Sequence, residues 1–167
     1  MKLIAKSRIL LSTASLSLAL FAGSASAEYR VTAFGYSSEY EALLAKDVAS
    51  AKSILGDRAV TRLDFIETNN LCVTQILASE LESAFASCAA ALEKVDSDAT
   101  ITQATARAAK ASIYSNLAVA RAISGDMMGA SSDLEAALSL NSRDRNAVSN
   151  YTLIHDLATV AEVAQSL

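Results

Sequence analysis

The sequence predicts an all-α protein, built as a short stack of antiparallel helical hairpins. The chain of 167 residues has no proline and five glycines, and 52% of its residues are hydrophobic, many of them alanine. Alanine has the highest helix propensity, and small side chains allow helices to approach closely. Apolar residues recur at helical spacing through most of the chain, and one segment is repeated further along it. These three observations favour helices packed against each other over a sandwich or a barrel.

Residues 1–27 have the form of an export signal. Three basic residues precede an uncharged apolar run over 9–22, and an Ala-Ser-Ala sequence supplies the small residues that a signal peptidase reads. The run is shorter than the roughly 20 apolar residues of a membrane span. We therefore predict cleavage before Glu28, export to the periplasm or the medium, and no stable membrane insertion of the remaining chain. The alternative is an uncleaved N-terminal anchor.

The length and charge of the remaining 140 residues limit the number of domains and the possible partners. This length suits one domain with a single core. Removing the leader changes the formal net charge from −4 to −7. No cluster of Lys and Arg is present to bind nucleic acid or anionic lipid, so neither is expected as a partner. We divide the chain into the leader 1–27, an N-terminal segment with one helix over 28–64, and a helical repeat region over 65–167.

Local signals place six helices after the leader. The segment 29–34 (YRVTAF) is strand-like but has no evident partner strand, so we expect an extended lead-in. Ser38 and Glu41 have the spacing of a capping box at the start of the first helix, and Gly56 can end that helix. Asp64 can cap the second helix. The expected helices span 38–55, 65–78, 80–94, 101–124, 126–140 and 143–164.

An internal repeat organises the second half of the chain. Residues 70–92 align without a gap with residues 116–138, and seven of 23 positions are identical, including Asn70 with Asn116. Asn116 is followed 34 residues later by Asn150, and each of the three asparagines precedes a large apolar residue. The breaks between successive helices are short, so consecutive helices must pack antiparallel. A hairpin of this kind buries its apolar face by stacking on the next one.

The unit over 111–144 ends its first helix in the sequence Ser-Gly-Asp, and its apolar and small residues include Tyr114, Leu117, Ala118, Gly125, Ala130, Leu134 and Ala137. In these features it resembles the tetratricopeptide repeat (TPR) family, whose unit is a helical hairpin of about 34 residues. The resemblance extends to 65–98 and to half a unit over 145–163, so it implies a TPR-like α-solenoid of about two and a half repeats. Unlike the family, the chain has no proline after the second helix, and its first two units are 46 residues apart.

The two cysteines, Cys72 and Cys88, occupy the positions that Ala118 and Leu134 fill in the second unit. In the hairpin that the resemblance implies, these positions face each other on adjacent helices. Helices packed through small residues lie about 8 Å apart, and an even pair of cysteines in an exported protein is normally bridged. We predict a Cys72–Cys88 disulfide across the first hairpin. The alternative is two buried free thiols.

The sequence shows no arrangement of side chains suited to catalysis or to metal binding. Its one histidine, His155, stands beside Asp156 in an expected helix, where adjacent residues point about 100° apart. The chain has no G-x-S-x-G motif, no Cys-x-x-Cys motif and no glycine-rich phosphate loop. One histidine and two paired cysteines do not supply the ordered ligands of a metal site. We therefore expect no catalytic activity, no metal and no cofactor.

The resemblance implies one binding site, the inner face formed by the first helices of the stacked units. This inner face comprises Ile66, Asn69, Val73, Ile76, Leu77, Ser112, Ser115, Val119, Ala122, Ile123, Asn146, Ser149, Leu153, Asp156 and Leu157. It has none of the Lys and Arg by which members of the family hold a C-terminal carboxylate, and it is largely apolar. The expected occupant is an apolar segment of another protein or peptide, or else the first helix or the tail of the chain itself.

These features predict an exported interaction or scaffold module that is not an enzyme. Two other functions remain open at this point. One is a structural or stress-related helical protein with no stable ligand. The other is an accessory subunit of an envelope enzyme. The oligomeric state and the identity of a partner do not follow from the sequence.

Overall fold

A computed structural model of the chain describes residues 13–19, 28–35, 37–56 and 58–165, with side chains for 29–35, 37–56 and 58–157. The strands are β1 (Thr13–Ala19) and β2 (Glu28–Phe34), and the helices are α1 (Ser38–Leu44), α2 (Val48–Gly56), the 3-10 helix η1 (Val60–Arg62), α3 (Phe65–Leu77), α4 (Leu81–Ser97), α5 (Gln103–Ser124), α6 (Met127–Leu140) and α7 (Arg145–Gln165). The described part is predominantly helical, which confirms the all-α class.

The expected leader lies outside the described residues except for β1. The cleavage of the chain before Glu28 therefore stays a prediction. None of the helices in the described residues combines the length and the apolar character needed to span a membrane.

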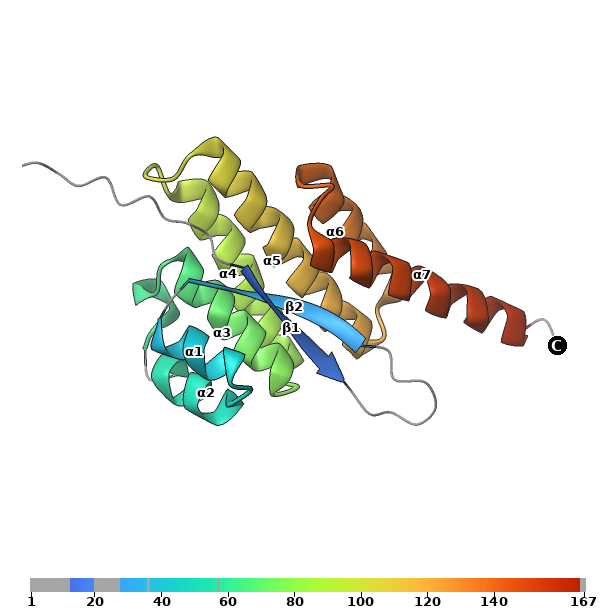
Figure 1. The fold of residues 1–167 in the computed structure, drawn as a ribbon, viewed down its shortest axis with the longest axis horizontal. Helices are drawn as coiled ribbons and strands as arrows, with labels where there is room; N and C mark the ends of the chain where they lie inside the picture. The colour runs from blue at the N-terminus through green and yellow to red at the C-terminus, as the bar shows by residue number, and fades with distance from the viewer. Residues whose placement is uncertain (1–12, 20–27, 36, 57, 166–167) are drawn as a thin grey trace, which may run out of the picture.

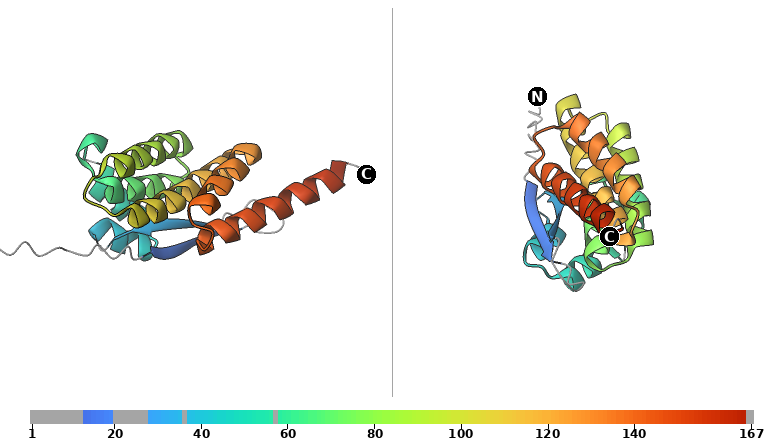
Figure 2. Two further views of the ribbon diagram at one scale, coloured as in Figure 1. Left: turned by 90° about the horizontal axis from the view of Figure 1, so that it is seen from above. Right: turned by 90° about the vertical axis from the view of Figure 1, so that its right-hand side faces the viewer.

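Helices α3 to α7 form two layers (Figures 1 and 2). Helices α3, α5 and α7 lie side by side in an inner layer, and α4 and α6 cover that layer, each in contact with the helix before it and the helix after it. Small side chains allow this close packing, because Ala84, Ala91, Ala118, Ala130 and Ala137 are all fully buried. The N-terminal helices α1 and α2 lie at the α3 end of the inner layer.

The expected helix over 38–55 is wrong, because this segment forms two helices. The chain leaves the helical conformation after α1, and Lys46 adopts a left-handed conformation with φ of 60°. The carboxylate of Asp47 then accepts a hydrogen bond from the N–H of Ser50 at 3.0 Å, at the start of α2. An Asp at such a position satisfies an N–H that has no partner within the new helix, and so favours the restart of the chain.

The two expected N-caps have different outcomes. The expected capping box of Ser38 and Glu41 is wrong, because the residue that precedes α1 is Ser37, whose side chain makes no capping hydrogen bond. The cap at Asp64 is confirmed and is part of a complete capping box with Glu67. The side chain of Asp64 accepts from the N–H of Glu67 at 2.8 Å, and the side chain of Glu67 accepts from the N–H of Asp64 at 3.1 Å.

Cys72 on α3 and Cys88 on α4 lie at disulfide distance. Their sulfur atoms are 2.01 Å apart and their Cα atoms 5.2 Å apart, and both side chains are fully buried. This distance agrees with the predicted pairing across the first hairpin. A paired arrangement of this kind also fits a protein that folds in an oxidising compartment.

We expect replacement of both Cys72 and Cys88 by alanine to lower the free energy of unfolding by about 3 kcal/mol, because the unfolded chain loses its cross-link. Urea unfolding followed by circular dichroism measures the loss. Wild-type protein unfolded in the presence of a reductant is the control, and its midpoint should approach that of the variant. Quantitative labelling of both thiols in the native exported protein would contradict the bridge.

Candidate functional site

Strand β2 occupies the inner face of the helical layer. It contacts α3, α5 and α7, the three helices of that layer (Figure 1). Its side chains are buried along most of the strand, at Tyr29, Val31, Thr32, Ala33 and Phe34. The extended conformation expected for residues 29–34 is confirmed, but the expectation of an unpaired lead-in is wrong, because β1 pairs antiparallel with β2. The inner face is therefore filled by β2, which was not among the expected occupants, namely a segment of another protein, the first helix or the tail.

Three asparagines bind the main chain of β2 at every second residue. In each pair the Oδ1 atom accepts from a main-chain N–H, and the Nδ2 atom donates to the carbonyl of the same residue, with distances of 2.7–2.9 Å. The pairs are Asn150 with Arg30, Asn116 with Thr32, and Asn70 with Phe34. We call Asn70, Asn116 and Asn150 the asparagine ladder. A carboxamide offers the same donor and acceptor as a peptide group, so the ladder replaces a neighbouring strand along this edge of β2.

Thr32, at the middle of β2, has further polar contacts. Its carbonyl also accepts from Nδ2 of Asn69 at 2.9 Å, and its hydroxyl oxygen accepts from Nδ2 of Asn146 at 2.7 Å. The Nδ2 atom of Asn116 also donates to Oδ1 of Asn69 at 2.9 Å, which joins the two side chains in one network. All four residues are buried. Each hydrogen bond removed here leaves a buried group unsatisfied, at a cost of about 1–3 kcal/mol.

The inner layer places one member of the ladder on each helix. Asn70 lies on α3, Asn116 on α5 and Asn150 on α7. Asparagine is a poor helix former because its short side chain competes for nearby main-chain groups. Three asparagines at the same position of three helices therefore lower local helix stability, and the bonds to β2 offset this cost.

Part of this site is predicted from the sequence. Asn69, Ser115 and Asn146 were expected on the inner face and lie there, all buried, with Oγ of Ser115 accepting from Nδ2 of Asn150 at 3.1 Å. The ladder itself was missed, because its recurring asparagines were used only to align the units. A residue of low helix propensity that recurs at one position of three predicted helices was the available signal.

The apolar residues expected on the inner face do not form an open groove. Val73, Ile76 and Val119 are fully buried in the core. The remaining expected residues are buried or half-buried, namely Ile66, Leu77, Ser112, Ala122, Ile123, Ser149, Leu153 and Leu157, except for Asp156, which is exposed. Where the structure describes this face, the chain's own β2 covers much of it.

Ionisable side chains lie near both ends of β2. Burial raises the pKa of the Tyr29 phenol above its usual value. Glu39 is buried, and its carboxylate accepts from the hydroxyl of Ser37 and from Nδ2 of Asn70, the latter at 3.4 Å. His155 is exposed, and its ring centroid lies 4.5 Å from that of Tyr151. Among the residues with described side chains, no three His, Cys, Asp or Glu gather to hold a metal ion.

Comparisons of the chain with models of protein families, with curated proteins and with solved structures find no match.

We expect Asn116→Ala to lower the free energy of unfolding by about 2–4 kcal/mol, because it leaves the N–H of Thr32 and Oδ1 of Asn69 without partners. The matched control is Asn141→Ala, which removes one exposed contact to the N–H of Arg143 and should cost less than about 1 kcal/mol. Chemical denaturation measures both. Equal losses in the two variants would show that the ladder does not hold β2.

Proposed function

We propose that the protein is an exported, TPR-like interaction module without catalytic activity, which recruits a partner protein through a strand held on its inner face. The observation that supports this function is the two-point bonding of the asparagine ladder to the main chain of β2. Bonds to the main chain hold a segment in an extended form whatever its side chains are. The inner face is thus suited to binding polypeptide, and the polypeptide that it holds is Glu28–Phe34.

Two observations support export. Residues 1–27 have the composition of a leader, and Cys72 and Cys88 lie at disulfide distance. Cleavage before Glu28 makes the first residue of β2 the N-terminus of the exported chain. The ladder would then hold the first seven residues of that chain, and an N-terminus is otherwise poorly ordered unless it is tied to the fold.

A structural protein with no stable ligand is the second candidate, and the burial of β2 favours it. Val31, Ala33 and Phe34 are fully buried, so β2 contributes to the core as well as to the ladder. In that case β2 would serve only to close the inner face of the helices. The two candidates differ in one respect, which is whether a partner contacts β2 in the exported protein.

We expect the exported protein to begin at Glu28. A leader with this charge, apolar run and Ala-Ser-Ala ending is removed during export. N-terminal sequencing of the protein recovered from the envelope or the medium identifies the first residue of the exported chain. A chain that still begins near Met1 would contradict the proposed cleavage.

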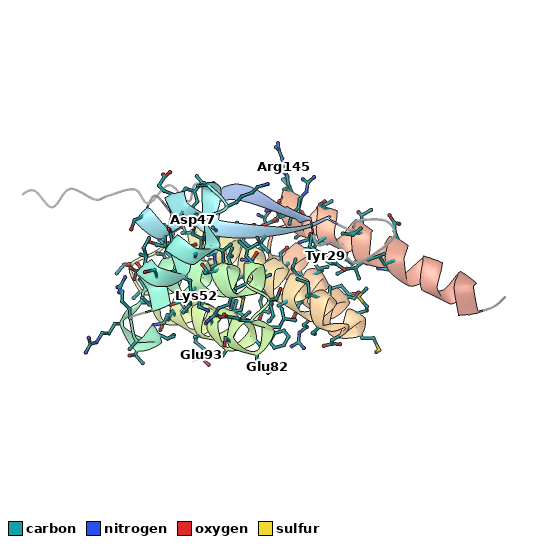
Figure 3. All side chains as sticks on the ribbon, turned by 90° about the horizontal axis from the view of Figure 1, so that it is seen from below. Tyr29, Asp47, Lys52, Glu82, Glu93 and Arg145 are labelled. Atoms are coloured by element: carbon teal, nitrogen blue, oxygen red, sulfur yellow. A yellow bond between two sulfur atoms is a disulfide. The ribbon has the colours of Figure 1, made fainter. Side chains whose placement is uncertain are left out.

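A photo-crosslinking amino acid at Tyr29 should capture the partner of the exported protein. Tyr29 lies on β2, and an aromatic crosslinker has a similar size, so the fold should be retained. The control position is Glu93 on α4, which lies with Glu82 on the side of the molecule opposite the strands (Figure 3). Mass spectrometry identifies the products formed in the native compartment.

Products from Tyr29 and none from Glu93 are the expected result. Products from Glu93 alone would place the interaction on the outer layer and contradict the proposal. If neither position yields a product in the native compartment, the structural candidate replaces the interaction module.

A further inference from the structure

Strand β2 has a second edge that the ladder does not use. The ladder bonds the N–H and C=O of Arg30, Thr32 and Phe34. Main-chain groups of successive residues in a strand point to opposite edges. The N–H and C=O of Tyr29, Val31 and Ala33 therefore point away from the ladder, and we call these three residues the outer edge of β2.

Strand β1 lies along the outer edge and pairs antiparallel with β2 over seven residue pairs (Figure 1). The pairs at the outer edge are Leu18 with Tyr29, Leu16 with Val31, and Ala14 with Ala33. The outer edge is thus open to a strand of this length, in this direction. With β1 in place, Val31 and Ala33 are fully buried.

Strand β1 belongs to the expected leader. Cleavage before Glu28 removes it and leaves three N–H and three C=O groups of the outer edge without their strand partners. The ladder still holds β2 from the other side, so the exposed edge stays extended. A rigid strand with one free edge is a template for pairing with another chain.

We propose that the outer edge of β2, once the leader has been cleaved, binds an extended segment of a partner protein as an added antiparallel strand. This inference rests on the proposed function and deepens it by naming the chemistry of the partner. Strand β1 shows that chemistry, because its sequence TASLSLA is uncharged and carries Ala, Leu and Leu opposite the outer edge, with serines between them. The partner segment is accordingly uncharged, with apolar residues at every second position.

The order already present in β2 favours this mode of binding. An added strand gains main-chain hydrogen bonds, and side chains at alternate positions give the selectivity. Only the partner segment must be ordered on binding, since the ladder has fixed β2 beforehand.

The test uses the exported, leader-free protein and a synthetic peptide with the sequence of residues 13–19. Hydrogen exchange followed by NMR reports each amide of β2. Before peptide is added, the amides of Arg30, Thr32 and Phe34 should be protected and those of the outer edge should exchange quickly. Peptide should slow exchange at the outer edge by about tenfold or more, and leave the ladder amides unchanged.

Two N-methylated peptides provide the matched control. Leu16 is paired with an outer-edge residue, so its N–H faces β2, whereas the N–H of Ser17 faces away. Methylation of the Leu16 nitrogen should weaken binding by about tenfold or more, the equivalent of about 1.4 kcal/mol. Methylation of the Ser17 nitrogen should leave the affinity within about twofold of the unmodified peptide, because no bond to β2 is lost.

Several results would overturn the inference. Outer-edge amides that do not respond to the peptide, or two methylated peptides that bind alike, would show that no strand is added there. An exported protein that retains residues 13–19 would never expose the edge. Protection of the outer edge without peptide, together with a dimer in sedimentation, would make a second copy the occupant. Fast exchange at Thr32 and Phe34 would instead overturn the proposed function, since the ladder would not be holding β2.

Discussion

The main-chain amides of β2 need hydrogen bonds, and the arrangement of the site depends on this requirement. A buried N–H or C=O without a partner is costly. Strand β1 pairs with one edge of β2. The neighbours along the other edge are helices, whose own main-chain groups are already bonded within each helix. Along the edge of β2 that faces the helices, side chains must therefore supply the hydrogen bonds. Asparagine suits this task because its carboxamide carries both a donor and an acceptor on a short, stiff side chain.

The packing of the helices makes the ladder geometrically possible. Every second residue of a strand advances by about 6.8 Å, whereas helices packed through small side chains lie about 8 Å apart. The difference of about 1 Å is within the reach of an asparagine side chain. Larger residues between the helices would move them apart, and their spacing would then no longer match that of alternate residues in β2. The Cys72–Cys88 pair contributes at one end, since Cys72 lies on α3 two residues after Asn70 and ties that helix to α4.

Local and repeated features of this fold were predictable from the sequence, and contacts between distant segments were not. Periodic apolar residues gave the helices from α3 onward, and the repeat aligned the two cysteines across one hairpin. The break at Lys46 was missed because alanine and leucine continue the helical pattern through it. Each hydrogen bond from the asparagine ladder to β2 joins residues that are 36, 84 or 120 positions apart in the chain, so no local sequence pattern links them. The sequence shows each asparagine only as a repeated position, whereas the structure shows that each binds the main chain of β2.

Because β2 is tethered and already occupies the inner face, it changes where a partner can bind. Because β2 is joined to the helices by a short connection, its effective concentration at the ladder is of the order of millimolar or higher. A free segment of equal affinity would have to exceed this concentration to displace it, and would also have to replace the buried side chains of Val31 and Phe34. Addition of a strand at the outer edge leaves the ladder and the core unchanged, so it avoids both costs. The ladder thus closes the inner face to outside peptides and also keeps the outer edge of β2 extended. An extended edge is the form that a partner strand needs.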